Sequence, residues 1–383
     1  MILTQCAVCA TELGLSLGMK CGRCSTRYCG PECRKQHWEG GGHDQLCKLI
    51  KKAGGAEQYY ANQKYAETVS VAAEVCAEDT KGQTCYICTQ ALHWKTKEGL
   101  VRGCACRGTA GFAHVSCLAE QAKILVTEVE ENNLGNKVLN ERCNRWFSCS
   151  LCEQSYHGVV RCALGWACWK TYAGRPETDQ LRRLAMGTLG NGLTTAGHHE
   201  DALPVKEAQF AMMRRFGASE GNMLITQGNL ASTYEQLGRI EEAGSLRRDV
   251  YFGWLKLKGR EHGGTLREAN NYANSLTQLR RYKEARSVLR KMMPVARRVL
   301  GESDEITLKM RWNYAGALCD DPDATLDDLR EAVTTNEETA RTARRVFGGA
   351  HPITSATEEF LRIARETLRA REELLQEVRK TIS

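Results

Sequence analysis

Apolar residues recur at helical spacing along much of this 383-residue chain. The stretch that follows Gly54 and Gly55 predicts one helix, because its apolar positions fall close to a single stripe. Those positions are Tyr59, Ala66, Val69, Ala73 and Cys76. Residues 118–133 predict a second helix, which should end near Asn132 and Asn133.

Residues 158–179 predict an amphipathic helix that ends at Gly174 and Pro176. Trp166 and Trp169 lie three residues apart and therefore share one face of this helix. We expect them to anchor the preceding part of the chain to the following part, with ligand binding as the alternative.

Four related segments follow, which is the pattern of a repeat protein. Their equivalent positions are separated by 41, 42 and 42 residues and are Thr188, Asn229, Asn271 and Asn313. A second marker is a glycine, with steps of 42, 42 and 47 residues, at Gly217, Gly259, Gly301 and Gly348. The longer last step matches an insertion around residues 320–327. Each unit predicts two helices, and stacked helical pairs form a curved solenoid with a concave groove.

The 19 cysteines add chemistry to this helical pattern. The first residues, MILTQCAVCA, do not place a basic segment before an apolar core, so we expect no secretory signal. No run of about 18 apolar residues predicts a membrane span. Cysteines in such a protein are expected to stay reduced and to bind metal. We therefore expect a protein of the cytoplasm or nucleus without a membrane partner.

The formal net charge of +7 counts every cysteine as neutral. Zinc-bound cysteines are thiolates. If fourteen cysteines and two histidines bind four Zn²⁺ ions, the thiolates remove fourteen charges and the ions restore eight, which leaves +1. A nearly neutral protein gives no electrostatic support to nucleic-acid binding, so we expect no nucleic-acid partner.

Cysteine and histidine pairs at zinc-ligand spacing form two groups of eight. The first group consists of Cys6, Cys9, Cys21, Cys24, Cys29, Cys33, His43 and Cys47. Interleaved pairing would place Cys6, Cys9, Cys29 and Cys33 on one ion and Cys21, Cys24, His43 and Cys47 on another. Such a short segment has little room for a hydrophobic core. Metal binding must therefore supply its folding free energy, about 10 kcal/mol or more per site. His37 competes with His43, but only His43 forms an H-x3-C pair.

The second group consists of Cys85, Cys88, Cys104, Cys106, His114, Cys117, Cys149 and Cys152. Each pair puts two ligands on one tight turn, and four pairs suffice for two tetrahedral zinc sites. Cys143 could substitute for a ligand, although the pairing is complete without it.

Residues 6–47 resemble the MYND-type zinc finger, and the resemblance extends to the accessory residues in RYCGPECRKQHWEGGGHDQLC. It implies a shallow groove for short proline-containing peptides. Gln36 and Trp38 match the residues that form this groove. Trp38 could instead only cover the second zinc site.

Residues 85–152 resemble the RING-CH (RING-variant) finger, although a PHD finger has a similar set of ligands. The family's cross-brace would place Cys85, Cys88, His114 and Cys117 on one zinc ion and Cys104, Cys106, Cys149 and Cys152 on the other. The resemblance implies a ubiquitin-protein ligase that acts without a covalent intermediate, by docking a ubiquitin-conjugating enzyme. Ile87 matches the aliphatic residue of the docking groove. Gln121, Leu151 and Glu153 depart from its pattern and favour a structural or recognition role.

The segment from about residue 180 to 370 resembles the tetratricopeptide repeats of kinesin light chains. The resemblance implies that Asn229, Asn271 and Asn313 face the concave groove and bond to the backbone of a peptide, whereas Thr188 departs from the pattern. Arg267, Asn274 and Lys309 should face the same way, which would suit an acidic peptide or a C-terminal carboxylate. The alternative is that these residues are solvated polar positions.

We therefore expect a mostly α protein in which two small zinc-stapled fingers precede an α-α solenoid. The expected domains are a MYND-type finger (1–50), a helical spacer (51–84), a RING-CH-type finger (85–157) and a repeat solenoid with a C-terminal capping helix (158–383). The main functional expectation is a zinc-binding ubiquitin ligase or ligase adaptor whose repeats and first finger select protein substrates. The alternative is a non-enzymatic, zinc-dependent scaffold for protein–protein interaction.

Overall fold

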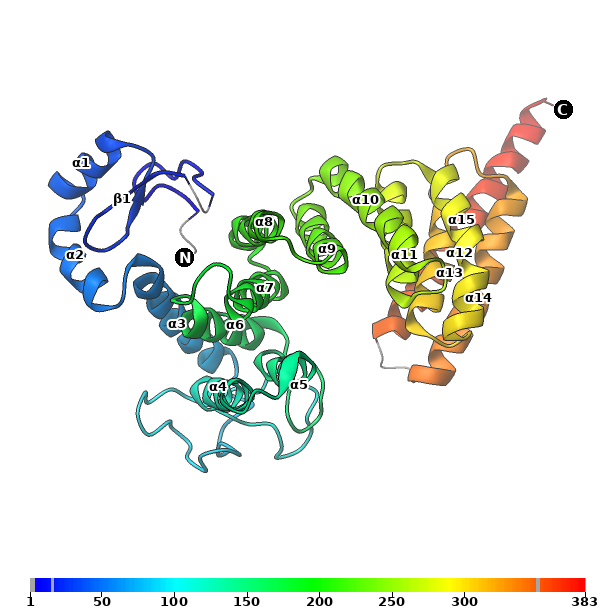
Figure 1. The fold of residues 1–383 in the computed structure, drawn as a ribbon. Coiled ribbons are helices and arrows are strands. Elements are labelled where there is room, and N and C mark those ends of the chain that lie inside the picture. The colour runs from blue at the N-terminus through cyan, green and yellow to red at the C-terminus, as the bar shows by residue number, and fades with distance from the viewer. Residues whose placement is uncertain (1–3, 15–16, 349–351, 383) are drawn as a thin grey trace. The chain divides into compact units, whose positions relative to one another are not determined.

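The computed structural model describes residues 4–14, 17–348 and 352–382. Its elements are mostly α-helices, which confirms the expected fold class (Figure 1). The chain divides into two compact units, Met1–Ala218 and Ser219–Ser383. This boundary falls inside the range 158–383 that the repeat pattern assigns to one solenoid, so the first helical pair of the repeat pattern belongs to the first unit.

The first unit begins with a small finger. Strands β1 (Met19–Lys20) and β2 (Arg27–Tyr28) pair antiparallel, and the helices α1 (Pro31–Glu39) and α2 (His43–Lys52) follow. Helix α1 starts with a proline, whose fixed φ suits the first turn, and buries no residue. With so little apolar burial, the finger depends on bound metal for its stability.

Helix α3 (Ala56–Val75) begins directly after Gly55, where the sequence predicts a helix. It packs against α6 within the first unit. The buried positions of this helix differ from the predicted stripe and are Ala56, Ala61, Tyr65, Val69 and Ala72. Ala66, which the stripe included, is exposed. The prediction was correct at Val69 and Cys76, which are buried, and wrong at Ala66, because the core contacts a face rotated from the one that the apolar count favoured.

A second small module follows α3. Its helices are α4 (Val115–Glu131) and α5 (Gly135–Cys143), and a 3₁₀ turn, η1 (Asn144–Trp146), leads out of it. Helix α4 ends where the sequence predicts it to end. Most of the module before α4 is irregular, with isolated bridges from Val101 to Ala113 and, after η1, from Ser148 to Ser155.

Helix α6 (Gly158–Tyr172) is the centre of the first unit, where it packs against α3, α4 and α7 (Figure 1). The sequence predicts an amphipathic helix, but all residues from Cys162 to Trp169 are buried. The correction follows from its position, because a helix covered on several sides has no solvated face. Trp166 and Trp169 lie in one continuous core with residues of the second module and of α7 and α8.

The first unit ends with α7 (Gln180–Thr195) and α8 (His199–Phe216). Glycines allow α7 to lie very close to α6. A Cβ atom on Gly165 would lie 3.1 Å from the Leu189 Cα atom, and one on Gly192 would lie 2.9 Å from the Arg161 carbonyl oxygen. The two backbones therefore approach more closely than side chains at these positions would permit.

The second unit is a stack of helical hairpins with a longer terminal helix (Figure 1). Its helices are α9 (Glu220–Gln236), α10 (Ile240–Lys258), α11 (Gly263–Gln278), α12 (Tyr282–Leu300), α13 (Glu305–Cys319), α14 (Leu326–Phe347) and α15 (Pro352–Ile382). Each helix packs against the next one along the chain. Ala243 and Ala285 are fully buried, and their small side chains allow the paired helices to approach closely.

A buried ion network joins the first three helices of the second unit. Arg247 of α10 is only 4% exposed. Its guanidinium group donates to Glu235 of α9 at 2.9 Å and to Glu268 of α11 at 3.2 Å. The hydroxyl of Ser275 donates a further bond to Glu235 at 2.8 Å. Satisfied partners on both sides make burial of this charge tolerable.

Candidate zinc centres and interaction surfaces

The cysteines and histidines that the sequence assigns to zinc form four clusters of side chains. Within each group, the four possible ligand atoms lie within 4.8 Å of one another. The groups are Cys6, Cys9, Cys29 and Cys33; Cys21, Cys24, His43 and Cys47; Cys85, Cys88, His114 and Cys117; and Cys104, Cys106, Cys149 and Cys152. The structure therefore brings together the interleaved pairs of both modules.

All four C-x2-C turns share one backbone device. The residue after the second cysteine has a left-handed conformation, with φ between 56° and 63° at Ala10, Ser25, Thr89 and Glu153. In each turn this residue donates its N–H to the carbonyl of the first cysteine, for example from Thr89 to Cys85 at 2.8 Å. The turn folds both sulfur atoms towards one point, which is where a metal would lie.

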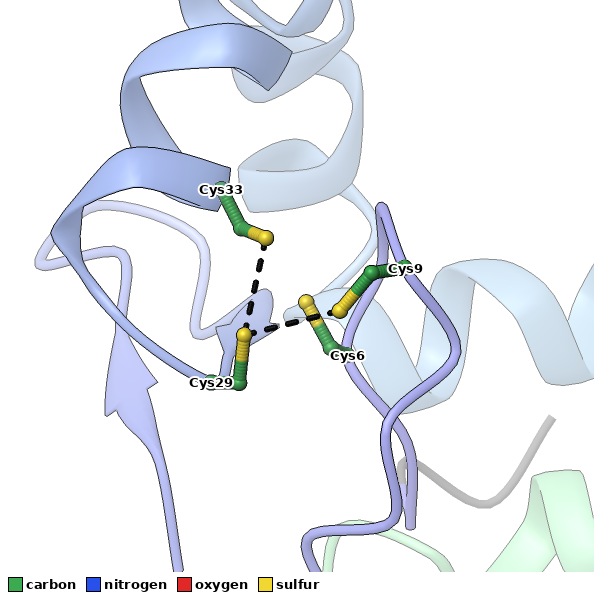
Figure 2. Close-up of side chains that lie close together, drawn as sticks. All are labelled: Cys6, Cys9, Cys29 and Cys33. Carbon is green, nitrogen blue, oxygen red and sulfur yellow. Dashed lines mark hydrogen bonds between the residues drawn. The ribbon is translucent and has the colours of Figure 1, made fainter.

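The first cluster links the start of the chain to α1, as Figure 2 shows. The Cys29 sulfur lies 3.5 Å from the Cys9 sulfur and 3.5 Å from the Cys33 sulfur. Cys29 directly follows β2, and Cys33 lies in the first turn of α1. Cys6 is buried, whereas Cys9 and Cys29 are exposed. The cluster thus lies at the surface of the finger.

The second cluster connects the β-hairpin to α2. His43 and Cys47 lie one turn apart on α2 and therefore on the same face. The His43 Nε2 atom lies 3.4 Å from the Cys24 sulfur, and the sulfurs of Cys21 and Cys47 are 3.8 Å apart. His37, the competing histidine, instead places its Nδ1 atom 3.1 Å from the hydroxyl of Tyr28 and lies outside the cluster.

The third cluster places its histidine directly before α4. The His114 Nδ1 atom lies 3.3 Å from the Cys88 sulfur and 3.6 Å from the Cys117 sulfur. Its Nε2 atom lies 3.3 Å from the carbonyl oxygen of Ala91. Because a carbonyl oxygen only accepts, the proton is on Nε2, and Nδ1 presents its lone pair to the cysteines.

The fourth cluster joins the loop of Cys104 and Cys106 to the last C-x2-C turn. The sulfurs of Cys106 and Cys149 are 3.8 Å apart. Gly111 lies against this cluster with φ of +84°. A Cβ atom there would lie 2.6 Å from the Cys106 Cβ atom and 3.0 Å from its sulfur. Only glycine fits at this position, both for its conformation and for the space available.

Some candidate ligands already have a protonation that suits a metal, whereas burial raises the pKa of others, such as Cys104 and Cys117. Burial lowers the pKa of His43 and of His114, which keeps both rings neutral. The hydroxyl of Thr11 lowers the pKa of Cys9 to about 6. Burial raises the pKa of Cys152, but the Gln154 backbone N–H and neighbouring thiols lower it further, to about 7. A thiolate and a neutral imidazole are the forms that bind zinc.

The donor sets fit zinc in chemistry and in spacing. Two sulfurs on a tetrahedral zinc ion lie about 3.8 Å apart, given Zn–S bonds of about 2.3 Å. The sulfur–sulfur separations above, from 3.5 to 3.8 Å, are close to this value. The four clusters therefore fit four zinc sites. Four protein ligands complete each site, so a bound ion would act structurally.

The first finger has an exposed aromatic side chain beside a hollow. Trp38 is 42% exposed and lines a hollow of about 590 Å³ together with Pro31 and His43. Its ring centroid also lies 5.8 Å from that of His43, so Trp38 covers part of the second cluster as well. Gln36, which the family pattern pairs with Trp38, is exposed but is not among the residues that line this hollow.

The second module presents two aliphatic side chains on adjacent turns. Ile87 is 36% exposed and Leu151 is 51% exposed. Their preceding residues are joined, because the hydroxyls of Tyr86 and Ser150 lie 3.0 Å apart. The tips of the third and fourth clusters are thereby held together. Gln121 is half-buried on α4, where the family often has an aromatic residue.

The predicted groove residues of the repeats lie on α9, α11 and α13, and Asn229, Asn271 and Asn313 are half-buried. Asn271 donates to Glu268 at 3.2 Å, and Asn313 donates to Asn270 at 2.9 Å. Lys309 pairs with Glu305 on its own helix. Arg267 is exposed, and Asn274 is half-buried.

Sequence reasoning missed two residues on which these sites depend. Gly111 follows the short C-x-C pair in an unremarkable loop, and only its positive φ beside two ligands shows its role. Arg247 is one of many arginines on a repeat helix, and no local pattern distinguishes it from its exposed neighbour Arg248. A signal for either residue would require knowledge of contacts distant in the sequence.

Comparison with protein families identifies two modules. The MYND finger model matches residues 6–47, and the tetratricopeptide repeat model matches residues 265–305. The chain therefore carries a MYND finger and tetratricopeptide repeats, as the sequence indicates. The RING-CH resemblance of residues 85–152 stays a prediction. No curated protein sequence matches the chain.

Some solved structures are similar to part of this chain. Two of them are crystal structures of nearly identical TPR-like repeats of a kinesin light chain from Podosopora anserina, and one of the two is a single-substitution variant. Their sequences are 21–22% identical to this chain. Each match covers 54% of this chain and 96% of the other chain, with TM-scores of 0.44 and 0.43. BtubC (BKLC) from P. vanneervenii is 13% identical, with a TM-score of 0.43 and coverage of 70% of this chain and 92% of its own.

Proposed function

We propose that this chain is a zinc-dependent scaffold that binds segments of partner proteins. The observation that carries the proposal is the surface of the MYND finger, where Trp38 stands 42% exposed beside a hollow of about 590 Å³. Tetratricopeptide repeats typically bind proteins and add a second binding module to the same chain.

The chemistry of this hollow suits a short extended peptide. An exposed indole is a flat apolar surface, and grooves lined by aromatic residues bind proline-rich segments in their preformed extended conformation. Charged side chains of both signs surround the indole, including Arg23, Lys35 and Glu39. They can fix the direction of a bound peptide through hydrogen bonds at its ends.

Binding at this surface should depend on zinc. Trp38 lies at the end of α1, and α1 buries no residue of its own. The helix is held at its start by Cys33 and covered at its end by the contact between Trp38 and His43. Loss of metal from these clusters should release α1 and disperse the hollow.

The proposal is tested with an array of proline-containing peptides and the zinc-loaded full chain. Peptides that bind should lose at least about tenfold in affinity with Trp38→Ala, because a hot-spot tryptophan contributes more than about 1.4 kcal/mol. Trp94→Ala is the matched control, since Trp94 is 68% exposed on the other module. Equal losses with both variants, or no loss with Trp38→Ala, would refute a specific role of the hollow.

A ubiquitin ligase remains a second candidate, and one observation favours it. Ile87 and Leu151 are exposed on two zinc turns that the Tyr86–Ser150 contact holds together. Two neighbouring aliphatic side chains on rigid turns could dock a ubiquitin-conjugating enzyme through a small apolar contact. Such a module would do no covalent chemistry of its own.

A ubiquitin-chain assay decides on this second candidate. Zinc-loaded protein is mixed with ubiquitin, the activating enzyme and a panel of conjugating enzymes. Ligase activity should fall at least about tenfold with Ile87→Ala. Ile124→Ala is the matched control, because Ile124 is 50% exposed on α4. The absence of chains with every conjugating enzyme of the panel would rule this function out and leave the scaffold.

A further inference from the structure

A groove rich in arginine lies between three helices of the second unit. We call it the arginine groove, and its volume is about 640 Å³. Its charged lining residues are Arg290 and Arg297 of α12, Glu302 before α13, Arg311 of α13, and Glu331, Glu338, Arg341 and Arg345 of α14. The lining thus contains five arginines and three glutamates, so the groove has an excess of positive charge.

Every glutamate of the arginine groove already has arginine partners. Glu302 pairs with Arg297 and Arg311. Glu338 pairs with Arg311. Glu331 accepts a hydrogen bond from the hydroxyl of Tyr314 at 2.8 Å and lies 3.8 Å from Arg290. The carboxylates are therefore engaged, and the positive excess resides on the other arginines.

That excess is concentrated on Arg341 and Arg345. The two side chains lie one turn apart on α14 and are exposed. Neither forms a hydrogen bond or an ion pair with any residue in the described part of the chain. Two adjacent guanidinium groups without partners are an arrangement that carboxylates bind well, since each offers a planar pair of donors.

The groove also has an apolar part. Met293 and Pro294 of α12 line it, and Tyr314 of α13 is held in place because its hydroxyl accepts from Arg290 at 2.8 Å. Met293 is half-buried and Pro294 is exposed. A flexible thioether beside a proline ring provides space for one aliphatic side chain of a ligand.

We propose that the arginine groove binds an acidic linear segment of a partner protein, with carboxylates on Arg341 and Arg345 and one apolar side chain against Met293. This inference rests on the proposed scaffold function and names the chemistry of one of its partners. The site is distinct from the predicted concave groove. Asn271 and Arg267 of that groove lie on α11, which contributes no residue to the arginine groove. Lys309 and Asn313 share α13 with Arg311 but are not lining residues, because each lies two positions from Arg311 and therefore on another face of the helix.

The observations favour a peptide over a nucleic acid. A continuous row of phosphates would pass Glu302, Glu331 and Glu338, which line the groove together with the arginines. Repulsion between the phosphates and these three carboxylates would cost binding free energy. A peptide can instead alternate carboxylates with uncharged residues and place its apolar side chain at the apolar part of the groove.

The test uses the zinc-loaded full chain and a short fluorescein-labelled peptide of Glu and Asp with one central Leu. We expect fluorescence anisotropy to show binding that weakens with added salt. The double variant R341E/R345E should weaken binding at least about tenfold. K256E/K258E is the matched control with the same change of charge, because Lys256 and Lys258 are exposed at the equivalent end of α10.

Three results would overturn the inference. The first is equal binding of a control peptide in which Gln and Asn replace Glu and Asp. The second is a loss of binding with Arg267→Glu but not with R341E/R345E, which would move the acidic ligand to the concave groove and leave the scaffold function intact. The third is tighter binding of a single-stranded oligothymidylate that R341E/R345E abolishes, which would make the groove a nucleic-acid site. Failure of the proline-peptide array tests the MYND surface separately.

Discussion

At the scale of single residues, the metal clusters depend on backbone conformation as much as on their ligands. Four residues that are not glycine adopt a left-handed conformation directly after the C-x2-C pairs. Such a conformation costs about 1 kcal/mol or more at each position. Metal binding, at about 10 kcal/mol or more per site, exceeds that cost several-fold. The turns can therefore tolerate side chains such as Thr89 and Glu153.

Gly111 allows a direct test of this dependence. Gly111→Ala should lower the zinc content by about one ion per chain, because the new Cβ atom would lie 2.6 Å from the Cys106 Cβ atom. Inductively coupled plasma mass spectrometry of the purified protein measures this content. Gly108→Ala is the control, since Gly108 also has positive φ but has no atom within 4 Å of its Cβ position. Four ions in the Gly111→Ala protein would contradict the assigned role.

Residue types and spacing were sufficient to predict which cysteines and histidines cluster, but not their surroundings. The pairs such as Cys85 and Cys88 are local in sequence, so a count of intervening residues identifies them. Gln36 matches a family position, yet it does not line the hollow beside Trp38. Gln36 and Trp38 lie two residues apart on α1, and residues at that spacing point to different faces of a helix.

At the scale of helices, the sequence predicted where elements begin and end better than which face they bury. Gly55 and Asn132 mark helix ends that the structure confirms. The helix α6 shows the limit, because its apolar composition was compatible both with one buried stripe and with burial on several sides. Contacts with α3, α4 and α7 decide between the two, and other elements separate α3 and α4 from α6 in the sequence.

Substitution of a glycine at the contact between α6 and α7 should have the opposite effect from substitution of a glycine in open space. Gly192→Ala should lower the free energy of unfolding by about 1–3 kcal/mol, because its Cβ atom would lie 2.9 Å from the Arg161 carbonyl oxygen, a backbone atom that cannot rotate away. Gly316→Ala in α13 should raise it by about 0.5–1 kcal/mol, since the position is open and alanine favours the helix. Urea unfolding followed by circular dichroism measures both changes. A stabilised Gly192→Ala protein would show that the helices can separate without cost.

At the scale of the whole molecule, the two units are stabilised in different ways. Metal clusters contribute to the stability of the first unit, whereas the second unit depends on helical packing. All four clusters lie in Met1–Ala218. Several of their cysteines, such as Cys85 and Cys149, belong to the same hydrophobic core as α6, α7 and α8. The second unit has its own core around Leu266, Leu289 and Met310. Within the described residues, no helix is both long and apolar enough to cross a membrane.

The sequence predicted a MYND finger before the repeats, as the family models confirm, but it could not locate the boundary between the two units. The repeat pattern is continuous through Gly217, so periodicity alone assigns α7 and α8 to the solenoid. The glycine contacts of α7 with α6, and the packing of α8 against α7, instead give both helices a shared core with the second zinc module. The physical reason is that one repeat sequence can stack on any complementary helix, and α6 provides one.

Removal of zinc should therefore unfold the two units unequally. A strong chelator should remove four ions per chain and raise amide hydrogen exchange in both zinc modules and in α6 and α7, because the third and fourth clusters share one core with these helices. Protection in α9–α15 should persist, since no cluster contributes to the core of that unit. Added zinc should restore protection in the first unit and thereby serves as the control. Equal loss of protection in both units would mean that the repeats depend on the fingers for their fold, whereas retained protection of α6 would mean that helical packing alone sustains the first core.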